Sequence, residues 1–463
     1  MAGDGYPLPF GYGDVARFLT GVVDLNRAGG AGFDDVAGDV ARLGLPAGTP
    51  VLVCLSNGRR LLDMYFAVLL AGGVPLTVSP ATSSARIAAL ATEVGAGAVV
   101  AARPDPARYG GETVVAVGDA QAVVLPARYR RTGVAGTVLM STSGTSGLFS
   151  ACLHRADSLV RNARRHADAV GLTGRDTVLV NLPLFYSYAI VAQALAALVT
   201  GARLVVSGPP FSPEAYEAAV GRYAVTSSSL TPTIARLLLA QGTRLPVGLR
   251  MLTVGGDRIA PEHVTRLRSA NPDVELYVTY GLTEAGPRVS TLAAHREPPG
   301  RHGSVGVPLD GVTVSLRGAP PDGTAAELLV SADTVMLAKV GTRQAGRTLV
   351  APGVVATGDL FRIDDGYLFF EGRLSDFVVV RGEKVSLHAV RQFVQSLPDV
   401  VRCSTHVGED AAGTTHFDLE VGVTGGTDVA RQRIRRAVDR FLLAGERPRD
   451  ITVHEADLAV FQK

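Results

Sequence analysis

The sequence is poor in cysteine. Only three occur among 463 residues, Cys54, Cys152 and Cys403, and they lie far apart in the chain. An odd number at such spacings gives neither a disulfide framework nor a pattern of metal ligands. Such a chain suits a reducing environment, and we predict a cytoplasmic location.

Long apolar runs and long runs of one charge are also missing. The opening MAGDGYPLPF lacks the basic and then apolar segments of a secretion signal, and the apolar stretch 188–200 is too short to span a bilayer. That stretch is predicted to form a buried helix. The formal net charge is +2 and no block of Lys or Arg stands out, so neither nucleic acid nor a membrane is expected as a partner. Small-molecule chemistry is the class that remains favoured.

Lysine is scarce as well, because almost all positive charge is arginine. Lysine occurs only at Lys339, Lys384 and Lys463. A GC-rich genome explains such a bias, and any single lysine is then a chance survivor. The alternative is that lysine persists where a compact ammonium is needed and a planar guanidinium would not serve.

Alternating apolar patterns fill the chain from about Pro50 to Val278. Short runs, several apolar on both faces, predict strands at PVLVCL, GAVVAA, TVLMST, TVLVNLP, ARLVVS and RMLTVGG. Between them, helices are predicted at RRLLDMYFAVLLA, ADSLVRNARRHADAV, PEAYEAAVGRY and PEHVTRLRSA, the last two with proline in the first turn. This order predicts an α/β fold with doubly wound, mostly parallel sheets and ligands at the carboxyl ends of the strands.

The pattern changes after about Pro298. Short strands with Gly and Pro turns, GSVGVPLDGVTVSL, AELLVSA and GYLFFEGR, predict a small antiparallel or barrel-like part. The last ninety or so residues mix the helical segments HAVRQFVQSL and VARQRIRRAVDRFLLA with the strands HFDLEVGV and DITVHEA. They predict a small α+β domain at the C-terminus.

A loop rich in Ser, Thr and Gly, STSGTSGLFSACLH, begins at Ser141. It follows a predicted strand and is expected to lead into a helix, so its backbone N–H groups and hydroxyls can converge on phosphate oxygens. The Gly-Lys-Ser/Thr ending of a Walker loop is absent, and such loops are often plain connectors. Its candidate phosphate-binding residues are Thr142, Ser143, Gly144, Thr145, Ser146 and Gly147.

Two later motifs support a functional interpretation of this loop. TYGLTEAG, residues 279–286, follows the predicted strand VELYV, and ATGDLFRIDDGYLFFEGRLSDFVVVRGEKVS spans residues 356–386. In this order and spacing the three motifs resemble the adenylate-forming superfamily of acyl-CoA synthetases, carrier-protein adenylation domains and luciferases. The resemblance covers essentially the whole chain. It implies a large N-terminal adenylation domain, residues 1–374, and a mobile C-terminal lid domain, residues 375–463.

The resemblance implies a role for each motif. The Ser/Thr/Gly loop would hold the β- and γ-phosphates of ATP, Thr283 would contact the α-phosphate, and Glu284 would ligate Mg²⁺, a hard cation that prefers oxygen ligands. Tyr280 and Gly281 belong to the same nucleotide-binding turn. Asp359 would accept hydrogen bonds from both ribose hydroxyls.

Basic residues complete the implied site. Arg373 would reach the ribose or the phosphates, and Lys384 falls where the family often has a basic residue. The family brings its catalytic lysine from the small domain, and Lys463 lies 90 positions after Arg373, close to the family's separation. An incidental terminal lysine is the alternative, since the usual Pro, Thr and Gly around it are not recognisable.

Three positions depart from the family pattern. The loop has Ser150 where a lysine is usual, which removes a cation near the outer phosphates. The hinge position carries Ser375 instead of Asp or Lys, which puts the thiol-transfer step in question. Tyr186 stands where many acyl-CoA synthetases have His, and with Phe185 it is expected either to line the acyl pocket or to pack in the core.

The acid that is activated is only partly specified. No Asp or Glu occurs between Asn181 and Thr200, where amino-acid-activating relatives have an acid, so an aryl or alkyl carboxylic acid is expected. Gly255 and Gly256 would leave room for a flat or extended acyl group. ADSLV, residues 156–160, contains the Asp-Ser-Leu of phosphopantetheine attachment sites, but an N-terminal helix cap is the preferred interpretation, and any carrier protein is then a separate chain.

The leading hypothesis is an ATP- and Mg²⁺-dependent ligase. It would form an acyl-adenylate from a carboxylic acid, release pyrophosphate, and pass the acyl group to the thiol of CoA or of a separate phosphopantetheinyl carrier protein. One alternative is an enzyme that stops at the adenylate or delivers it to an amine. Another is a nucleotide- or acyl-binding protein with little catalysis.

Overall fold

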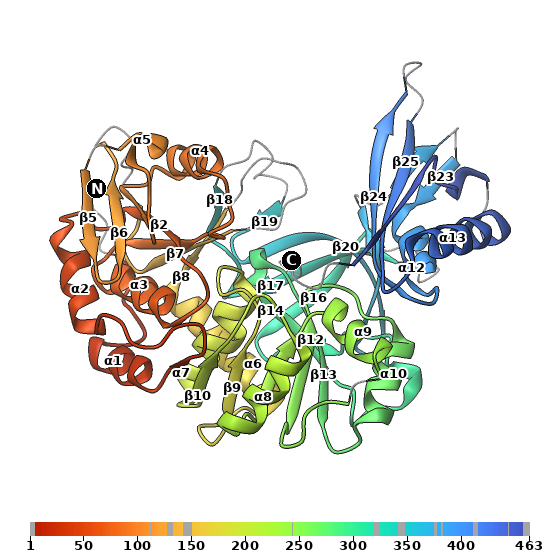
Figure 1. The fold of residues 1–463 in the computed structure, drawn as a ribbon, viewed down its shortest axis with the longest axis horizontal. Helices are drawn as coiled ribbons and strands as arrows, with labels where there is room; N and C mark the ends of the chain where they lie inside the picture. Colours follow the sequence, from red (N-terminus) through yellow and green to blue (C-terminus); the bar gives the residue numbers. More distant parts are fainter. Residues whose placement is uncertain are drawn as a thin grey trace.

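The computed structural model describes most of the chain. The described residues are 5–111, 113–126, 133–141, 151–242, 244–318, 325–340, 348–374, 377–380, 383–410, 415–442 and 444–456. A large N-terminal domain and a small C-terminal domain stand side by side in Figure 1, the small one in blue. No helix within these ranges is both long and apolar enough to cross a bilayer.

Sheet A of the large domain follows the predicted doubly wound pattern. Its strands are parallel from β1 to β13, and β14 and β15 then run antiparallel to their neighbours. In order across the sheet they are β1 (Val23–Asp24), β10 (Arg203–Val206), β9 (Thr177–Val180), β11 (Ser227–Leu230), β12 (Met251–Gly255), β13 (Glu275–Gly281), β14 (Arg288–Ala293) and β15 (Val307–Pro308).

Sheet B of the large domain has a parallel centre and antiparallel edges. Strands β7, β3, β2 and β4 are parallel, while β8 and β18 on one side and β6 and β5 on the other are antiparallel. Across the sheet they are β18 (Ala338–Val340), β8 (Ala151–Arg155), β7 (Thr137–Ser141), β3 (Val74–Thr77), β2 (Pro50–Cys54), β4 (Ala98–Ala101), β6 (Ala120–Val124) and β5 (Thr113–Val117).

The helices of the large domain pack on these sheets. One hydrophobic cluster runs from Val51 and Val100 in sheet B to Val180 and Leu252 in sheet A, so the two sheets share a core. The helices are α1 (Tyr12–Thr20), α2 (Phe33–Arg42), α3 (Arg59–Leu70), α4 (Ser84–Val94), α5 (Pro106–Tyr109), α6 (Ala156–Val170), the π-helix Tyr188–Leu195, α7 (Ala196–Thr200), α8 (Pro213–Tyr223), α9 (Pro232–Ala240) and α10 (Pro261–Ala270). The buried helix expected at 188–200 is therefore present as a π-helix that continues into α7.

Two expectations for the region after the Ser/Thr/Gly loop are wrong. The loop does not lead directly into a helix, because β8 lies between it and α6 and pairs antiparallel with β7. The segment ADSLV does open α6, but the N-cap residue is Arg155 and no side chain caps the helix. Instead, Asp157 in the first turn accepts hydrogen bonds from Arg155 and Arg161.

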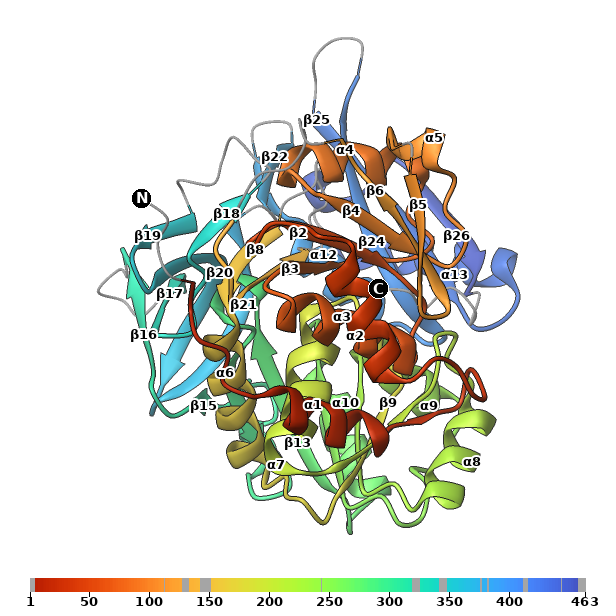
Figure 2. The ribbon, with the colours of Figure 1, turned by 90° about the vertical axis from the view of Figure 1, so that its left-hand side faces the viewer.

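Apart from β15, which joins sheet A, the predicted short strands after Pro298 belong to a third, antiparallel sheet, sheet C. It comprises β16 (Val312–Arg317), β17 (Ala326–Ala332), β20 (Val354–Asp364), β19 (Leu349–Ala351) and β21 (Tyr367–Arg373), with β21 paired to β20. In Figure 2 these strands, in cyan and light blue, lie beside both sheets of the large domain. Sheet C thereby brings β20 next to the end of β13.

The small domain has its own core. It contains the hairpin β22 (Phe377–Val380) and β23 (Glu383–Ser386), the sheet β24 (Val400–Glu409), β25 (Thr415–Val423) and β26 (Ile451–Glu455), and the helices α12 (Leu387–Gln395) and α13 (Thr427–Phe441). It touches the large domain where Arg236 of α9 donates two hydrogen bonds, of 3.0 and 3.2 Å, to the carbonyl of Val401.

Candidate active site

The predicted residues of the nucleotide turn and of the acyl pocket lie where strands of sheet A end. Gly255 ends β12, Gly281 ends the neighbouring β13, and the chain then turns through a short 3₁₀ segment, Thr283–Ala285, before it returns as β14. Carboxyl ends of neighbouring parallel strands are the usual position of ligand sites in such sheets. The structure therefore brings the predicted nucleotide turn and the predicted acyl pocket together.

Glu284 forms an ion pair that sequence reasoning missed. Its Oε1 atom lies 2.7 Å from Nζ of Lys339, and the two side chains are 14% and 16% exposed. Lys339 is the one lysine that the family resemblance left without a role. The scarcity of lysine in the sequence was the available signal. No sequence motif, however, linked Lys339 to the carboxylate of Glu284, 55 positions away.

The backbone around Lys339 fixes this ion pair. The Met336 amide donates to the Glu284 carbonyl at 2.9 Å, and the Thr334 hydroxyl donates to the Ala285 carbonyl at 3.0 Å. Strand β18 then pairs with β8, with Lys339 opposite Cys152. The ammonium is thus held against the Glu284 turn from the strand next to the one that follows the Ser/Thr/Gly loop.

Thr283 contacts the other side of the site. Its hydroxyl lies 2.9 Å from that of Ser187, in the loop before the π-helix. Phe185, in the same loop, is buried, and its carbonyl accepts a 3.3 Å hydrogen bond from Thr77. Phe185 also contacts Tyr186 edge to face, with ring centroids 4.8 Å apart. The half-buried Tyr186 ring lies in the loop that reaches Thr283, and burial raises the pKa of Tyr186.

Asp359 is buried and is held by two neighbours. Its Oδ2 atom accepts a 2.7 Å hydrogen bond from the Tyr280 hydroxyl, and its Oδ1 atom accepts a 2.9 Å hydrogen bond from Nε of Arg373. Arg373 lies directly opposite Asp359 across the β20–β21 pair, and its own side chain is 61% exposed. Burial raises the pKa of Asp359, although Arg373 and Tyr280 oppose that rise. Burial, and then the Asp359 charge, raise the pKa of Tyr280 well above its usual value.

The two glycines of the predicted acyl pocket have different reasons to be glycine. A Cβ at Gly255 would lie 2.3 Å from the Thr279 hydroxyl oxygen, so the close approach of β12 and β13 requires glycine there. Gly256 has φ +90°, a backbone conformation that favours glycine, and a Cβ there would lie 3.6 Å from the Tyr188 ring. The close approach of two strands thus accounts for Gly255, and the backbone conformation accounts for Gly256.

Several predicted residues lie outside the described part of the structure. These are Thr142, Ser143, Gly144, Thr145, Ser146, Gly147, Ser150, Ser375 and Lys463. The backbone of Lys384 is described in β23, where it pairs with Val379. The roles of these nine residues and of Lys384 therefore stay predictions from the sequence.

The described residues fit a nucleotide that carries a divalent cation. Oε2 of Glu284 accepts no hydrogen bond from any described residue, and a carboxylate oxygen of this kind is a preferred ligand of Mg²⁺. The described residues contain no group of three or more His, Cys, Asp or Glu side chains that would hold a metal by themselves. Such a cation would need the phosphate oxygens to complete its ligands, which is how Mg²⁺ is usually bound with nucleotides.

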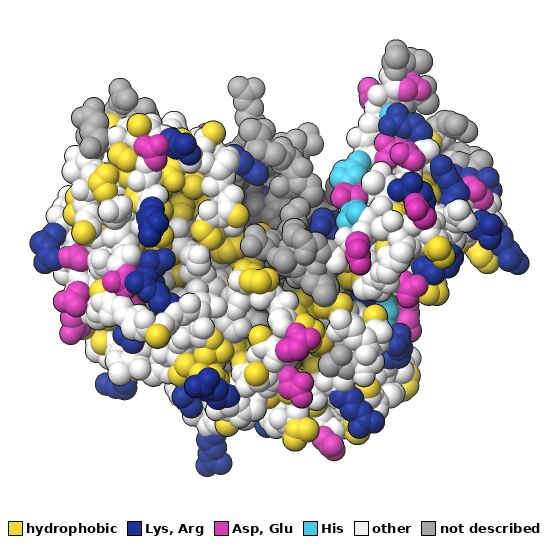
Figure 3. Space-filling model, in the orientation of Figure 1, with side chains coloured by type: hydrophobic (Ala, Val, Ile, Leu, Met, Phe, Trp, Pro, Cys, Tyr) yellow, Lys and Arg dark blue, Asp and Glu magenta, His cyan; other side chains and the backbone are white. Residues whose placement is uncertain are grey.

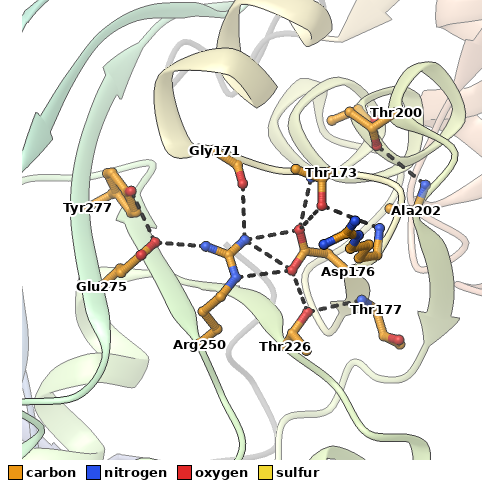
Figure 4. A network of polar contacts seen from close by, with 12 residues as sticks. Gly171, Thr173, Asp176, Thr177, Thr200, Ala202, Thr226, Arg250, Glu275 and Tyr277 are labelled. Carbon is orange, nitrogen blue, oxygen red and sulfur yellow. Dashed lines mark hydrogen bonds and ion pairs between the residues drawn. The ribbon is translucent and has the colours of Figure 1, made fainter.

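A second charged network is structural rather than functional. At the amino ends of the sheet A strands, Arg250 pairs with Asp176 at 3.0 Å and with Glu275 at 2.8 Å, and Thr226 donates to Asp176 (Figure 4). Every charge here has a partner from the chain itself. The surface in view in Figure 3 likewise has interspersed charges of both signs.

The sequence matches a known protein family over much of the large domain. A family model described as AMP-binding enzyme matches residues 33–338. The matched region contains Glu284, Thr283 and, at its end, Ala338, but not Asp359 or the small domain. Sequence relatives and solved structures extend the comparison beyond it.

Two sequence relatives illustrate the likeness. A 4-coumarate–CoA ligase-like protein of rice is 29% identical over 296 residues, 61% of this chain and 52% of that protein. A salicyl-AMP ligase/salicyl-S-ArCP synthetase of Mycobacterium tuberculosis is 26% identical over 403 residues, 79% of this chain and 70% of that protein. The match to the rice protein thus spans about half of that protein's length.

The fold likeness covers nearly the whole chain. O-succinylbenzoate coenzyme A synthetase from Bacillus subtilis, solved in complex with ATP and magnesium ion, superimposes with a TM-score of 0.74 over 94% of this chain and 92% of that one. The sequence identity is 19%, so this likeness shows the fold.

Proposed function

Because this chain belongs to the family of AMP-binding enzymes, we propose that it activates a carboxylic acid with ATP and Mg²⁺. The product is an acyl-adenylate, with release of pyrophosphate. The acyl group then passes to a thiol, of CoA or of a separate carrier protein. The relatives named as CoA ligases and as a salicyl-AMP ligase support this class of reaction.

One observation carries the proposal. Tyr280 links Asp359 to the turn that bears Glu284, since its hydroxyl donates to Asp359 at 2.7 Å and Glu284 follows it by four positions. A ribose acceptor on β20 and a cation ligand in the turn after β13, joined through Tyr280, are what a bound adenine nucleotide requires. Asp359, although held by Tyr280 and Arg373, still has acceptor capacity for hydroxyl donors, because a carboxylate offers about four lone-pair sites.

The charges around the phosphates come from separate elements. Lys339 supplies an ammonium next to Glu284 from the large domain itself. Lys463 of the small domain supplies the second ammonium, at the transferred phosphate, in the role that the family resemblance implies. Bound Mg²⁺ supplies Lewis-acid stabilisation of the phosphate charge. Preorganised donors of this kind stabilise developing charge without reorganisation during the reaction.

The two-domain division is part of the proposal. Strand β21 ends at Arg373 and the hairpin of the small domain starts at Phe377, which supports a boundary near Ser375. The contact of Arg236 with the Val401 carbonyl belongs to one relative position of the domains. Rotation of residues 375–463 about this boundary would let the small domain serve both half-reactions.

The experiment that tests the proposal is a screen for pyrophosphate release. ATP, Mg²⁺ and the protein are incubated with aryl, alkyl and amino acids, and the same screen is run with Lys463→Ala. Acid-dependent release by the wild-type chain and a large loss in the variant are expected. No release with any acid would favour the nucleotide-binding protein without catalysis, and an undiminished rate in the variant would remove Lys463 from the site.

The acceptor is tested with the acid that works best. CoA, a phosphopantetheinylated carrier protein and a simple amine are each added to that reaction. A new thioester with CoA or with the carrier protein is expected. An amide and no thioester would instead support the amide-forming alternative.

A further inference from the structure

Arg288 is a buried arginine at the start of β14. It follows the Glu284 turn by four positions and is 2% exposed. Its backbone is fixed to α6, because its amide donates to Asn162 at 2.9 Å and its carbonyl accepts from the same side chain at 2.8 Å. The guanidinium is therefore held in the interior.

This guanidinium has few partners in the chain. It donates one 2.8 Å hydrogen bond, from a terminal nitrogen to the Thr279 hydroxyl, and it lies over the Tyr188 ring at 4.2 Å. Its Nε atom is buried and has no hydrogen-bond partner among the described residues. A guanidinium carries five N–H donors and a full charge. Most of these donors therefore have no acceptor among the described residues.

No carboxylate among the described residues compensates the charge. Arg288 forms no ion pair there, and the two undescribed segments next to β8 and β18, residues 142–150 and 341–347, contain neither Asp nor Glu in sequence. The nearby His166 is neutral, since burial and the Arg288 charge lower the pKa of His166 to about 3. Burial also lowers the pKa of Arg288.

Other buried or half-buried arginines are better matched. Arg250 has two carboxylate partners (Figure 4), and Arg236 donates twice to the Val401 carbonyl. Burying an ion without compensation costs several kcal/mol or more. A ligand anion would therefore stabilise the Arg288 charge more than that of Arg250 or Arg236.

The position of Arg288 is that of the proposed acyl pocket. A Cβ built on Gly255 would lie 3.4 Å from the same terminal nitrogen that bonds Thr279. The Tyr188 ring lies beneath the guanidinium, and its hydroxyl lies 3.0 Å from the Thr253 hydroxyl, which lies 2.7 Å from that of Ser229. Arg288 thus bonds β13 beside Gly255 of β12, one of the two glycines predicted to admit the acyl group.

We propose that the acid activated by this protein carries a second anionic group, a carboxylate or a sulfonate, which pairs with Arg288. This inference rests on the proposed function. One carboxylate reacts at the nucleotide, and the other anion accepts hydrogen bonds from the unused guanidinium N–H groups. Arginine and an oxyanion form charge-assisted, often bidentate, hydrogen bonds, so the pair selects strongly for such an acid.

The first test needs no variant. Pyrophosphate release is measured for acids matched in size: succinate against butyrate, glutarate against pentanoate, and isophthalate and 3-sulfobenzoate against 3-methylbenzoate. Within at least one set, kcat/KM is expected to favour the dianion by roughly 10- to 100-fold, which corresponds to one hydrogen-bonded charge pair. Equal or higher kcat/KM for the neutral-substituted acid in every set would overturn the inference.

The second test uses Arg288→Gln and Arg288→Lys, with Arg301→Gln as the matched control. Arg301 also lies over a tyrosine ring, that of Tyr367 at 3.9 Å, but it is paired with Glu297 and Asp365. The preference for the dianion should disappear in Arg288→Gln, return in part in Arg288→Lys, and stay in the control. A uniform loss for both acids of a pair would mean that Arg288 binds the reacting carboxylate or only stabilises the fold.

A binding readout separates this inference from the proposed function. The same acids are added to the wild-type chain and to Arg288→Gln without ATP, and their dissociation constants are measured by calorimetry. Tighter binding of dianions by the wild-type chain, lost in the variant, supports the Arg288 site even if no pyrophosphate is released. Equal dissociation constants for both members of every pair count against it whether or not the enzyme turns over.

Discussion

The ammonium of Lys339 lies 2.7 Å from Oε1 of Glu284. The contact joins β18, at the edge of sheet B, to the turn that follows β13 of sheet A. The sequence departs from the family pattern at Ser150, where a phosphate-binding lysine is usual. The position of Lys339 suggests how the protein compensates for that missing lysine. A cation next to the outer phosphates can come from β18 instead of from the loop.

Lys339→Met should weaken ATP binding most when Mg²⁺ is absent. Without the divalent cation, the Lys339 ammonium is the positive charge that the described residues place next to Glu284. Loss of this ammonium should raise the dissociation constant of ATP by about 10-fold, the value of one charge-assisted hydrogen bond. With saturating Mg²⁺ the effect should shrink, because the metal then compensates Glu284. Calorimetry in EDTA and in Mg²⁺ measures both values.

The control for that measurement is Arg362→Met, which removes an exposed cation from a carboxylate pair on β20. It should change neither dissociation constant. An equal loss in EDTA and in Mg²⁺ for Lys339→Met would show that Lys339 stabilises the turn and does not act through its charge.

Ser150→Lys should restore what Lys339→Met removes. If both positions supply a cation to the same phosphates, the loop lysine alone should lower the KM for ATP, and the double variant should recover most of the affinity lost in Lys339→Met. Steady-state KM values for ATP in the four combinations give the coupling between the two sites. If Ser150→Lys lowers the KM for ATP by the same factor with and without Lys339→Met, the two positions serve different groups.

Asp359→Asn should lose nucleotide affinity with little loss of stability. The carboxylate accepts from Tyr280 and Arg373, and a ribose would add two further donors, which an amide accepts less well. We expect AMP to bind about 10-fold more weakly or worse. Since burial raises the pKa of Asp359, replacing the charged form should leave the unfolding midpoint near neutral pH unchanged or higher.

Tyr280→Phe provides the companion measurement. It removes one donor from Asp359 and leaves the carboxylate in position, so AMP affinity should fall by a smaller factor than in Asp359→Asn. Fluorescence or calorimetric titration with AMP ranks the two variants. A larger loss in Tyr280→Phe would mean that the tyrosine hydroxyl itself contacts the nucleotide.

Asp63→Asn should stabilise the protein in a pH-dependent way. Asp63, on α3, is 3% exposed, and burial raises the pKa of Asp63 to about 6, although Arg59 opposes the rise. The native state therefore holds a proton that the unfolded chain releases above its ordinary pKa of about 4, and stability falls as pH rises between these values. Above about pH 6 the full cost, about 2–3 kcal/mol, is present.

The measurement is urea unfolding of both chains at about pH 5 and about pH 8. The advantage of Asp63→Asn in the free energy of unfolding should grow by about 1–2 kcal/mol between these pH values. Asp364→Asn, at a carboxylate that is 64% exposed, is the matched control and should give the same difference at both. A stability advantage of the Asp63→Asn variant that is independent of pH would contradict the raised pKa of Asp63.

Regular elements with local signals were predictable from the sequence. Helices α8 and α10 have the predicted bounds, since a proline opens each and α8 is also capped by Ser212, whose hydroxyl accepts from the Ala215 amide. Strand β17 also has the predicted bounds. Strand β8 was missed, because its pairing with β7 and β18 depends on contacts that no local pattern records.

The candidate site residues that the sequence predicted are those that lie within a motif. The turn with Glu284 and the position of Asp359 followed from the order of motifs, and the opposition of Asp359 and Arg373 is the register of one hairpin. Lys339 and Arg288 were missed for a physical reason. Their partners lie on other elements, and a charged residue in a strand is ordinarily expected to face solvent.

The central claim is that this protein forms an acyl-adenylate in a reaction that depends on Glu284. Exchange of radiolabelled pyrophosphate into ATP, with the best acid from the screen, measures that reversible step directly. Exchange that requires the acid and falls at least about 100-fold in Glu284→Gln, but not in the control Glu297→Gln, is predicted. Acid-independent exchange, or exchange undiminished in Glu284→Gln, would contradict the account.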